Sequence, residues 1–164
     1  MDTKKLSVII CCYNEQATIR EIIERTSAVD LGAGWTREIL VIDNFSTDGT
    51  REILRQIEDP EIRVIFHERN MGKGMSIRTG IANMSGDYMI IQDADAEYDP
   101  AEHPRFCRKA DETGAAAIFG SRVLGGEVKY KYAHAYLGVR VLTAITNLLF
   151  GGRLTDVATA TKMV

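Results

Sequence analysis

Short apolar runs alternate with amphipathic segments along this chain, and that alternation limits the folds it can adopt. Residues with helical spacing lie between the runs and predict helices near 17–26, 53–57, 74–84 and 101–113, the second ending at Asp59-Pro60. Alternating strands and helices predict an α/β fold with a mainly parallel sheet flanked by helices. The apolar runs, partly β-branched and bounded by polar residues as buried strands are, cover residues 6–12, 38–43, 63–67, 88–93 and 115–120.

Composition limits the function classes. The 164 residues fit one domain of ordinary size. With 45% hydrophobic and 26% charged residues, the chain has the balance of a globular protein. A net charge of −3 argues against non-specific binding to nucleic acid. Three cysteines without a CxxC spacing give neither a disulfide framework nor a zinc site, so a cytoplasmic location is expected. No apolar stretch reaches the roughly 20 residues of a membrane-spanning helix.

Polar residues gather directly after each apolar run. In open parallel sheets, ligands bind beyond the carboxyl ends of the strands. We therefore expect a binding site at this edge of the sheet. The segments concerned are Tyr13-Asn14-Glu15, Asp43-Asn44, 70–74, 93–99 and Ser121-Arg122.

The strongest chemical signal is the acidic segment at the end of the run 88–93. Asp93 and Asp95 form a D-x-D pattern, which Glu97 and Asp99 continue at the same spacing. Magnesium or manganese bound with a nucleotide requires only one or two protein carboxylates. An EF-hand is excluded, because Tyr98 stands where that loop requires glycine. Asp93 and Asp95 thus predict a metal or nucleotide site, whereas Asp99 is expected to cap the next helix.

Three further positions have a ligand-binding and a structural interpretation. Asp43 can accept hydrogen bonds from a base or a ribose, while Asp48 or Ser46 more plausibly caps the following helix. Glu15 can contact a nucleoside or stabilise the positive end of a helix. Lys73 lies in the segment 70–74, which can approach phosphate or simply form a turn, and which matches neither a P-loop nor a GxGxxG fingerprint.

The histidines and cysteines have mainly structural interpretations. His67, His103 and His134 lack metal-ligand spacing and are expected to be structural or solvated. The cysteines are expected to be small buried hydrophobic residues.

The last third of the chain is basic and contains an amphipathic segment. Between Arg122 and Arg153, five basic residues, including Lys129 and Lys131, stand against the single acid Glu127. Such a region favours binding of an anion. A helix over 140–150 is expected either to pack on the sheet or to rest on a membrane surface. Its polar face carries Arg140, Thr143 and Asn147, and its apolar face Leu137, Val141, Ala144, Ile145 and Leu148.

Taken together, these motifs resemble family 2 glycosyltransferases, specifically the branch of dolichyl-phosphate mannosyltransferases and polyprenyl-phosphate hexosyltransferases. The matching motifs follow one another in order along nearly the whole chain. The resemblance implies a GT-A Rossmann-like fold and, for residues 1–164, a single nucleotide-sugar-binding domain that is short at its C-terminus relative to the family. The motifs are SVIICCYNE, VIDNFSTDGT, NMGKG, GDYMIIQDAD, GSR and LTDVATATKM.

The resemblance also implies roles for individual residues. Tyr13, Glu15 and Asp43 would contact the nucleoside. Asp93 and Asp95 would hold the ribose and the metal-diphosphate, with Glu97 as a further metal ligand. Arg122 would bind phosphate and Asp156 would be the candidate base. The chain departs from the family in having Cys11-Cys12 instead of Pro-Thr and Asn44 as the second residue of the usual Asp-Asp pair.

The reaction implied is transfer of a hexose from a nucleoside-diphosphate sugar, of the GDP-mannose or UDP-glucose type, with inversion at the anomeric carbon. Mg²⁺ or Mn²⁺ at Asp95 would neutralise the departing diphosphate, and Lys73 and Arg122 are further candidates to contact the donor or its phosphates. A lipid phosphate acceptor needs little base help, whereas a saccharide hydroxyl would need Asp156 as base. The basic region 129–153 favours the phosphate, and with it a role in cell-envelope or glycan biosynthesis.

Two other hypotheses about the function must be compared with this one. A sugar-1-phosphate nucleotidyltransferase usually has a glycine-rich loop after its first strand, and residues 11–15 contain no glycine. A non-catalytic nucleotide-sugar-binding module would bind donor without transferring it. The expected location is the cytoplasm, with peripheral contact to the cytoplasmic face of a membrane.

Overall fold

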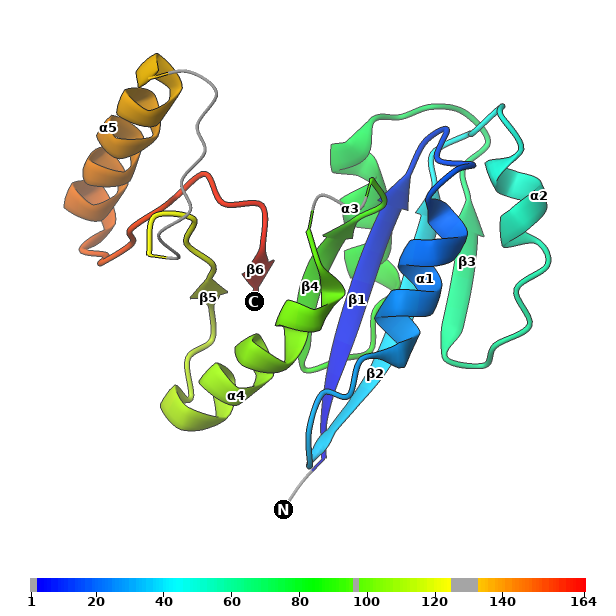
Figure 1. The fold of residues 1–164 in the computed structure, drawn as a ribbon, viewed down its shortest axis with the longest axis horizontal. Helices are drawn as coiled ribbons and strands as arrows, with labels where there is room; N and C mark the ends of the chain where they lie inside the picture. Colours follow the sequence, from blue (N-terminus) through cyan, green and yellow to red (C-terminus); the bar gives the residue numbers. More distant parts are fainter. Residues whose placement is uncertain (1–2, 96–97, 125–132) are drawn as a thin grey trace.

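A computed structural model describes residues 3–95, 98–124 and 133–164 of the chain. Strands and helices alternate from the N-terminus, as the sequence pattern predicts (Figure 1). The elements are β1 (Lys4–Cys12), α1 (Ile19–Ala28), β2 (Trp35–Asp43), α2 (Thr50–Leu54), β3 (Ile62–Phe66), α3 (Lys73–Asn83), β4 (Tyr88–Asp93), the 3₁₀ turn η1 (Pro100–Glu102), α4 (His103–Thr113), β5 (Ile118–Phe119), α5 (Ala133–Phe150) and β6 (Lys162–Met163).

The described strands form one mainly parallel sheet in the order β3-β2-β1-β4-β6-β5. β1 pairs with both β2 and β4 in parallel, and β2 pairs with β3 in the same way. The prediction of a mainly parallel sheet is therefore confirmed. β6 runs antiparallel to its neighbours β4 and β5, and the sequence did not predict it, because two residues are too few to show a periodicity.

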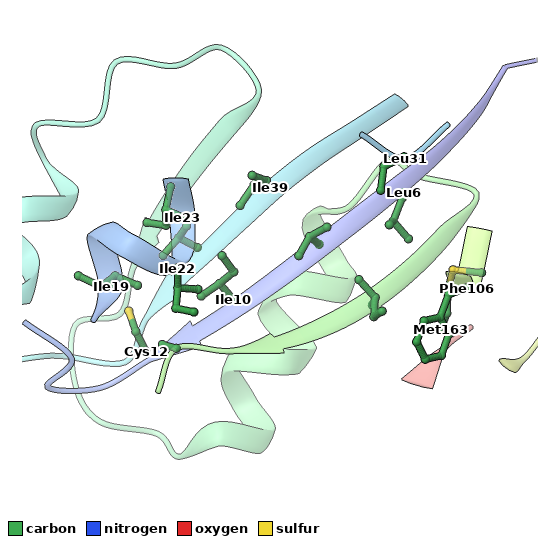
Figure 2. Packing of buried hydrophobic residues seen from close by; sticks show 14 of the residues in the cluster. Leu6, Ile10, Cys12, Ile19, Ile22, Ile23, Leu31, Ile39, Phe106 and Met163 are labelled. Atoms are coloured by element: carbon green, nitrogen blue, oxygen red, sulfur yellow. The ribbon is translucent and has the colours of Figure 1, made fainter. Parts of the chain in front are cut away.

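Helices cover both faces of this sheet. Side chains of alternate strand residues, such as Leu6 and Ile10, pack with α1, α2 and α4 into the larger hydrophobic cluster (Figure 2). The intervening residues Ile9, Leu40 and Ile42 form a second cluster on the opposite face. This two-sided burial explains why the strand sequences are almost continuously apolar.

Helix α3 approaches the second cluster very closely. A Cβ atom placed on Gly80 would lie 2.6 Å from Cγ2 of Ile9. Any side chain there would have to push the helix away from β1, because the γ atoms of a β-branched residue have little freedom to move. The glycine therefore sets the distance between α3 and the sheet.

Several expected local features are present and one differs. The stripe Ile19, Ile22, Ile23 and Thr26 is buried on α1, and the side chain of Asp99 accepts a hydrogen bond from the backbone N–H of Ala101 at the start of η1. Helix α2 ends at Leu54, several residues before the proline expected to stop it.

Helix α5 differs from the other long helices in the direction of its apolar face. In Figure 1 it stands beyond β5 and β6, away from α1, α2 and α3. Leu148 and Phe150 are 85% and 81% exposed, and Leu137, Val141 and Ile145 are also exposed. The apolar face therefore does not pack on the sheet, which was one of the two expected arrangements. In the part of the chain that is described, no helix is long and apolar enough to span a membrane.

The polar face of α5 binds the segment that precedes β6. Thr143 is buried, and its Oγ1 accepts a hydrogen bond from the backbone N–H of Val157 at 3.1 Å. Asn147 makes two hydrogen bonds of 2.8 Å to the backbone of Leu154, donating to its carbonyl and accepting from its N–H. These contacts attach the helix to the 154–157 segment through its polar side.

Candidate functional site

A cavity of about 300 Å³ lies at the carboxyl ends of the central strands. It is formed by the ends of β1, β2 and β4 together with the first turn of α3, where binding sites of open parallel sheets occur. The structure thus brings together residues from four separate motifs. The predicted site residues in its lining are Tyr13, Glu15, Lys73, Asp93 and Asp95.

Asp43, the last residue of β2, is not among the residues that line this cavity. Its side chain is fully buried, and its carboxylate accepts a hydrogen bond from the backbone N–H of Ser46 at 3.2 Å. Nε of Arg51 lies 3.2 Å from Oδ2 of Asp43, and the Arg51 guanidinium stacks over the ring of Phe66. In this conformation Asp43 holds the loop between β2 and α2, and the neighbouring Asn44 is the residue that reaches the cavity.

Asn44 belongs to a polar network that sequence reasoning missed. Its Nδ2 donates to Oδ1 of Asn70 at 2.8 Å, and its Oδ1 accepts from the backbone N–H of Met71 at 2.9 Å. Nδ1 of the buried His67 lies 3.1 Å from the same Oδ1, while His67 Nε2 lies 3.0 Å from Oγ1 of Thr79. Because an amide oxygen only accepts, His67 must donate through Nδ1. The network fixes the loop that precedes α3.

The loops after β1 and β2 are held together by side-chain to backbone hydrogen bonds. Ser46 accepts from the N–H of Asn14, and Thr50 accepts from the N–H of Glu15, both at 2.9 Å. The amide oxygen of Asn14 accepts from the N–H of Thr47 at 2.8 Å. Asn14 has a left-handed backbone with φ of 57°, a conformation that asparagine tolerates better than most residues. These hydrogen bonds hold the two loops together, and Tyr13 consequently has a fixed position at the cavity.

Glu15 and Asp48 take the local positions expected of helix-start residues. Oε2 of Glu15 accepts from Oγ1 of Thr18, just before α1. Oδ1 of Asp48 accepts from the backbone N–H of Thr50, the first residue of α2. Glu15 also lines the cavity, so the nucleoside and helix-dipole interpretations are compatible with one another.

The β4 side of the cavity carries the acidic pair. Asp93 is the last residue of β4 and lies opposite Cys11 of β1 in the sheet. Nζ of Lys73, the first residue of α3, forms a hydrogen-bonded ion pair with Oδ1 of Asp93. Partial burial opposes the charge of Lys73, but the hydrogen bond and charge of Asp93 outweigh it and raise the lysine pKa. Asp95 is exposed on the turn that follows.

The buried side chains of Gln92 and His103 stabilise that acidic turn. Nε2 of Gln92 donates to the carbonyls of Asp93 and Tyr98, at 3.1 and 2.8 Å. His103 Nε2 lies 3.1 Å from Oε1 of Gln92 and must donate to it, because that oxygen is an acceptor. Burial, assisted by Arg37, lowers the pKa of His103 to about 4, so the ring is neutral at pH 7. Both ends of the turn are therefore attached to one side chain.

The residues present fit a divalent cation that arrives with a nucleotide. Asp93 and Asp95 offer hard oxygen ligands on one short segment at the cavity, and such cations need only one or two protein carboxylates when phosphates complete their coordination. Glu97, the third expected ligand, lies outside the described residues. Within the described ranges, no group of three or more His, Cys, Asp or Glu side chains forms a complete protein cage for a metal.

Arg122 and Asp156 form a separate ion pair in the C-terminal region, in which Asp156 is buried and Arg122 is partly exposed. Nε and Nη2 of Arg122 donate to the two carboxylate oxygens of Asp156, at 2.7 and 3.0 Å. The backbone N–H of Ala158 donates to the same carboxylate at 3.2 Å. These bonds from Arg122 lower the pKa of the buried Asp156. The basic residues Lys129 and Lys131, expected to extend this region, lie outside the described residues.

The histidine interpretation agrees with the structure where it describes these residues, and the cysteine interpretation holds for two of the three cysteines, because Cys11 is only partly buried. His67 and His103 are buried and hydrogen-bonded, as structural residues should be, whereas the side chain of His134 lies outside the described residues. Cys12 and Cys107 are buried. Cys11 lines the cavity, and burial raises its pKa to about 11, so that it remains an uncharged thiol.

The family model described as Glycosyl transferase family 2 matches residues 7–163 of this chain. Two similar curated proteins, from Salmonella dublin and Salmonella enteritidis PT4, are both named undecaprenyl-phosphate 4-deoxy-4-formamido-L-arabinose transferase and are 43% identical over 114 residues. The matched stretch is 66% of this chain and 34% of each relative, so the chain spans about a third of the length of these proteins.

Two solved structures show the same fold. S. aureus TarS 1–349, in complex with UDP, matches with a TM-score of 0.61 at 23% identity over 69% of this chain and 34% of that chain. The mannosyltransferase PcManGT from Pyrobaculum calidifontis, in complex with GDP-Man and Mn²⁺, matches with a TM-score of 0.59 at 24% identity over 68% of this chain and 34% of that chain. The expected GT-A Rossmann-like α/β fold is thereby confirmed.

Proposed function

The chain belongs to glycosyl transferase family 2, and from this premise we propose that it transfers a sugar from a nucleoside-diphosphate donor to a polyprenyl phosphate, with inversion at the anomeric carbon. The observation that carries the proposal is the cavity of about 300 Å³, in which five of the residues expected to bind donor or metal meet. They come from elements that are far apart in the sequence, and the parallel sheet brings them together at the carboxyl ends of its strands.

The donor would lie across the carboxyl ends of β1 and β4. Tyr13 is exposed at one side of the cavity and offers an aromatic face to a base. Lys73 and the first turn of α3 lie at the other side, where a lysine charge and a helix N-terminus both favour phosphate. The nucleoside would thus bind toward β1 and the diphosphate toward α3.

Asp93 and Asp95 would hold a divalent cation beside that diphosphate, as the Mn²⁺ in one structural neighbour suggests. Mg²⁺ or Mn²⁺ bound there would neutralise charge on the leaving group. Glu97 remains a proposed third ligand. The Gln92–His103 pair keeps the turn in place, so that the two carboxylates need little reorganisation when the donor binds.

The state of Asp156 favours a phosphate acceptor over a saccharide hydroxyl. A hydroxyl must lose a proton, and a carboxylate whose pKa is lowered by bidentate hydrogen bonds from Arg122 is a weak base for that purpose. A phosphate monoester is already ionised and can attack without such help. Arg122 would then be held by Asp156 in a fixed orientation near the acceptor phosphate. The Salmonella relatives are named as undecaprenyl-phosphate transferases, which agrees with this choice.

The exposed apolar face of α5 suggests how a lipid acceptor is reached. Side chains such as Leu148, Leu149 and Phe150 face outward. Arg140 on the same helix and Arg153 shortly after its end are also exposed. A helix with an apolar face and basic residues binds in the interface of an anionic membrane. We therefore place the protein at a membrane surface, peripherally bound through α5.

Calorimetric titration of GDP-mannose and UDP-glucose, each with and without Mn²⁺, tests the donor site. We expect one donor to bind only when Mn²⁺ is present, and binding to weaken at least 10-fold in Asp95→Asn. Glu112→Gln, which changes an exposed carboxylate on α4, is the matched control and should bind like wild type. Failure of every donor to bind to the folded wild-type protein would refute the proposed site.

The acceptor requires a second assay. Sugar transfer to undecaprenyl phosphate in mixed micelles should exceed transfer to a free saccharide, and it should persist at pH 5.5, because no carboxylate has to accept a proton. Donor binding without transfer to any acceptor would instead favour a non-catalytic sugar-nucleotide-binding module.

A further inference from the structure

Lys73 occupies an electrostatically unfavourable position in its helix. It is the first residue of α3, and no acidic residue stands in the first turn. The N-terminus of a helix carries a partial positive charge and favours anions rather than a lysine. Because Lys73 departs from this preference, we infer that it has a role other than stabilising the helix.

The ammonium of Lys73 contacts one of the two carboxylates that are expected to bind the metal. It forms an ion pair with Oδ1 of Asp93, and its charge also interacts with that of Asp95. The Asp93 side chain is only 18% exposed, whereas the Lys73 side chain is 59% exposed. The carboxylate is therefore fixed, and the lysine is the partner that is free to move on its flexible four-carbon stem.

We propose that Lys73 is an internal stand-in cation: it occupies Asp93 while the site is empty and is displaced most readily when a divalent cation arrives together with a diphosphate. This inference rests on the proposed function, because it assigns a step in donor binding at the same site. It gives Lys73 two successive partners, Asp93 in the free protein and the diphosphate in the complex.

The exchange makes metal and nucleotide binding depend on each other. A metal ion alone must displace Lys73 from Asp93 and leave that charge without a partner. A metal ion with a diphosphate provides the displaced lysine with a new anion at the N-terminus of α3. The free-energy difference between these cases is a coupling between two ligands, and such couplings are typically about 5–150-fold in affinity.

The test compares Mn²⁺ binding to wild type and Lys73→Met in two separate titrations, one without nucleotide and one with saturating GDP or UDP. Removal of the lysine frees Asp93, so we expect Mn²⁺ alone to bind about 5-fold more tightly to Lys73→Met than to wild type. The nucleoside diphosphate loses a cation, so in the presence of Mn²⁺ it should bind about 10-fold more weakly. The two changes have opposite signs.

Two control variants separate this role from general effects. Lys73→Arg keeps a charge and should retain most of the coupling, while Lys109→Met removes an exposed lysine of α4 and should change neither titration. Circular dichroism melting curves should show that all three variants are folded.

Other results would overturn the inference. An unchanged, weakened or undetectable affinity of Lys73→Met for Mn²⁺ alone means that Lys73 does not compete for the metal site. The metal-only titration contains no donor, so it decides this point even if no nucleoside diphosphate binds to wild type, an outcome that would count against the proposed function instead.

Discussion

The two parts of the molecule orient the apolar faces of their helices and strands in opposite ways. In residues 4–113, apolar side chains point into two clusters on the faces of the sheet, and polar residues gather at the strand ends. In α5, the apolar side chains face outward, and Thr143 and Asn147 point inward to hold the 154–157 segment. The apolar side chains of the first part are thus largely buried, whereas α5 exposes an apolar face.

The N-terminal and C-terminal parts of the chain therefore have different structural roles. The N-terminal part supplies a rigid cavity whose loops are fixed by buried polar networks around Asn44 and Gln92. The C-terminal part connects a partly buried ion pair, Arg122 with Asp156, to a helix whose apolar face points outward. Under the proposed function, donor binding and acceptor binding would depend on different regions, and substitutions should affect them independently.

The largest effect is expected from charges on the outer face of α5. Replacement of Leu148 and Phe150 by Asp should weaken binding to vesicles of phosphatidylglycerol by about 100-fold or more, since burial of each large apolar side chain contributes roughly 1.5–3 kcal/mol. The melting temperature should change little, because both side chains are exposed. Co-sedimentation with vesicles measures the binding.

Ile81→Asp is the matched control, since Ile81 is an exposed apolar residue on α3. It should bind vesicles like wild type. If wild type itself does not bind vesicles, or if the control loses as much binding as the α5 variant, the contrast between the two regions disappears.

Two glycine-to-alanine substitutions should change stability in opposite directions. Gly80→Ala should lower the free energy of unfolding by about 1–3 kcal/mol, because its Cβ would lie 2.6 Å from Cγ2 of Ile9. Gly138→Ala on α5, where no atom lies within 4 Å of a new Cβ, should be neutral or raise it by about 0.5–1 kcal/mol through helix propensity. Urea unfolding followed by circular dichroism measures both, and a destabilised Gly138→Ala would show that α5 is more tightly packed than described.

Stability should also depend on pH, and the two regions should respond in different windows. His103 has a pKa lowered from 6.5 to about 4, so the unfolded chain binds a proton in that interval and the folded protein does not. Stability should therefore fall as pH falls from 6.5 to 4, by no more than about 1.4 kcal/mol per pH unit. Asp156, whose pKa is lowered from 3.8, contributes stability that is lost only below that value.

Urea titrations from pH 7 to 4.5, followed by fluorescence of Trp35, measure the first window. His103→Gln can still donate a hydrogen bond to Gln92 but carries no titratable ring, so its stability should depend less on pH. Equal pH slopes in wild type and variant would contradict the assignment to His103.

Much of the fold follows from sequence patterns that depend on local physics. β4 coincides with the predicted run 88–93. Four residues of the stripe predicted for the helix near 17–26 are buried on α1, whereas Ala17 is exposed and precedes the helix. Both segments are long enough to show a period. β6 consists of two residues and forms through pairing with β4 and β5, so it has no local signal. The outward direction of the apolar face of α5 could not be predicted either, since periodicity defines a face but not its partner.

The candidate site shows the same limit. The cavity unites Tyr13, Lys73 and Asp95 because they follow parallel strands or begin the helix between them, and this could be expected from the sequence. The burial of Asp43 under Arg51 and the support of the acidic turn by His103 depend on contacts between distant segments. The sequence contained one indication of a special role for Asn44: it replaces the second aspartate of the pair that is usual in the family. In the structure this residue forms the polar network.

The attachment of the Asp156 segment to the inner face of α5 also bears on acceptor selectivity. With α5 lying on a lipid surface, the ion pair of Arg122 and Asp156 stands about one helix diameter above it, roughly 10 Å. In the proposed arrangement, the phosphate of the acceptor would meet the ion pair, and its hydrocarbon tail would stay in the membrane. The protein should therefore discriminate acceptors by their phosphate group and accept isoprenoid chains of different length with similar efficiency.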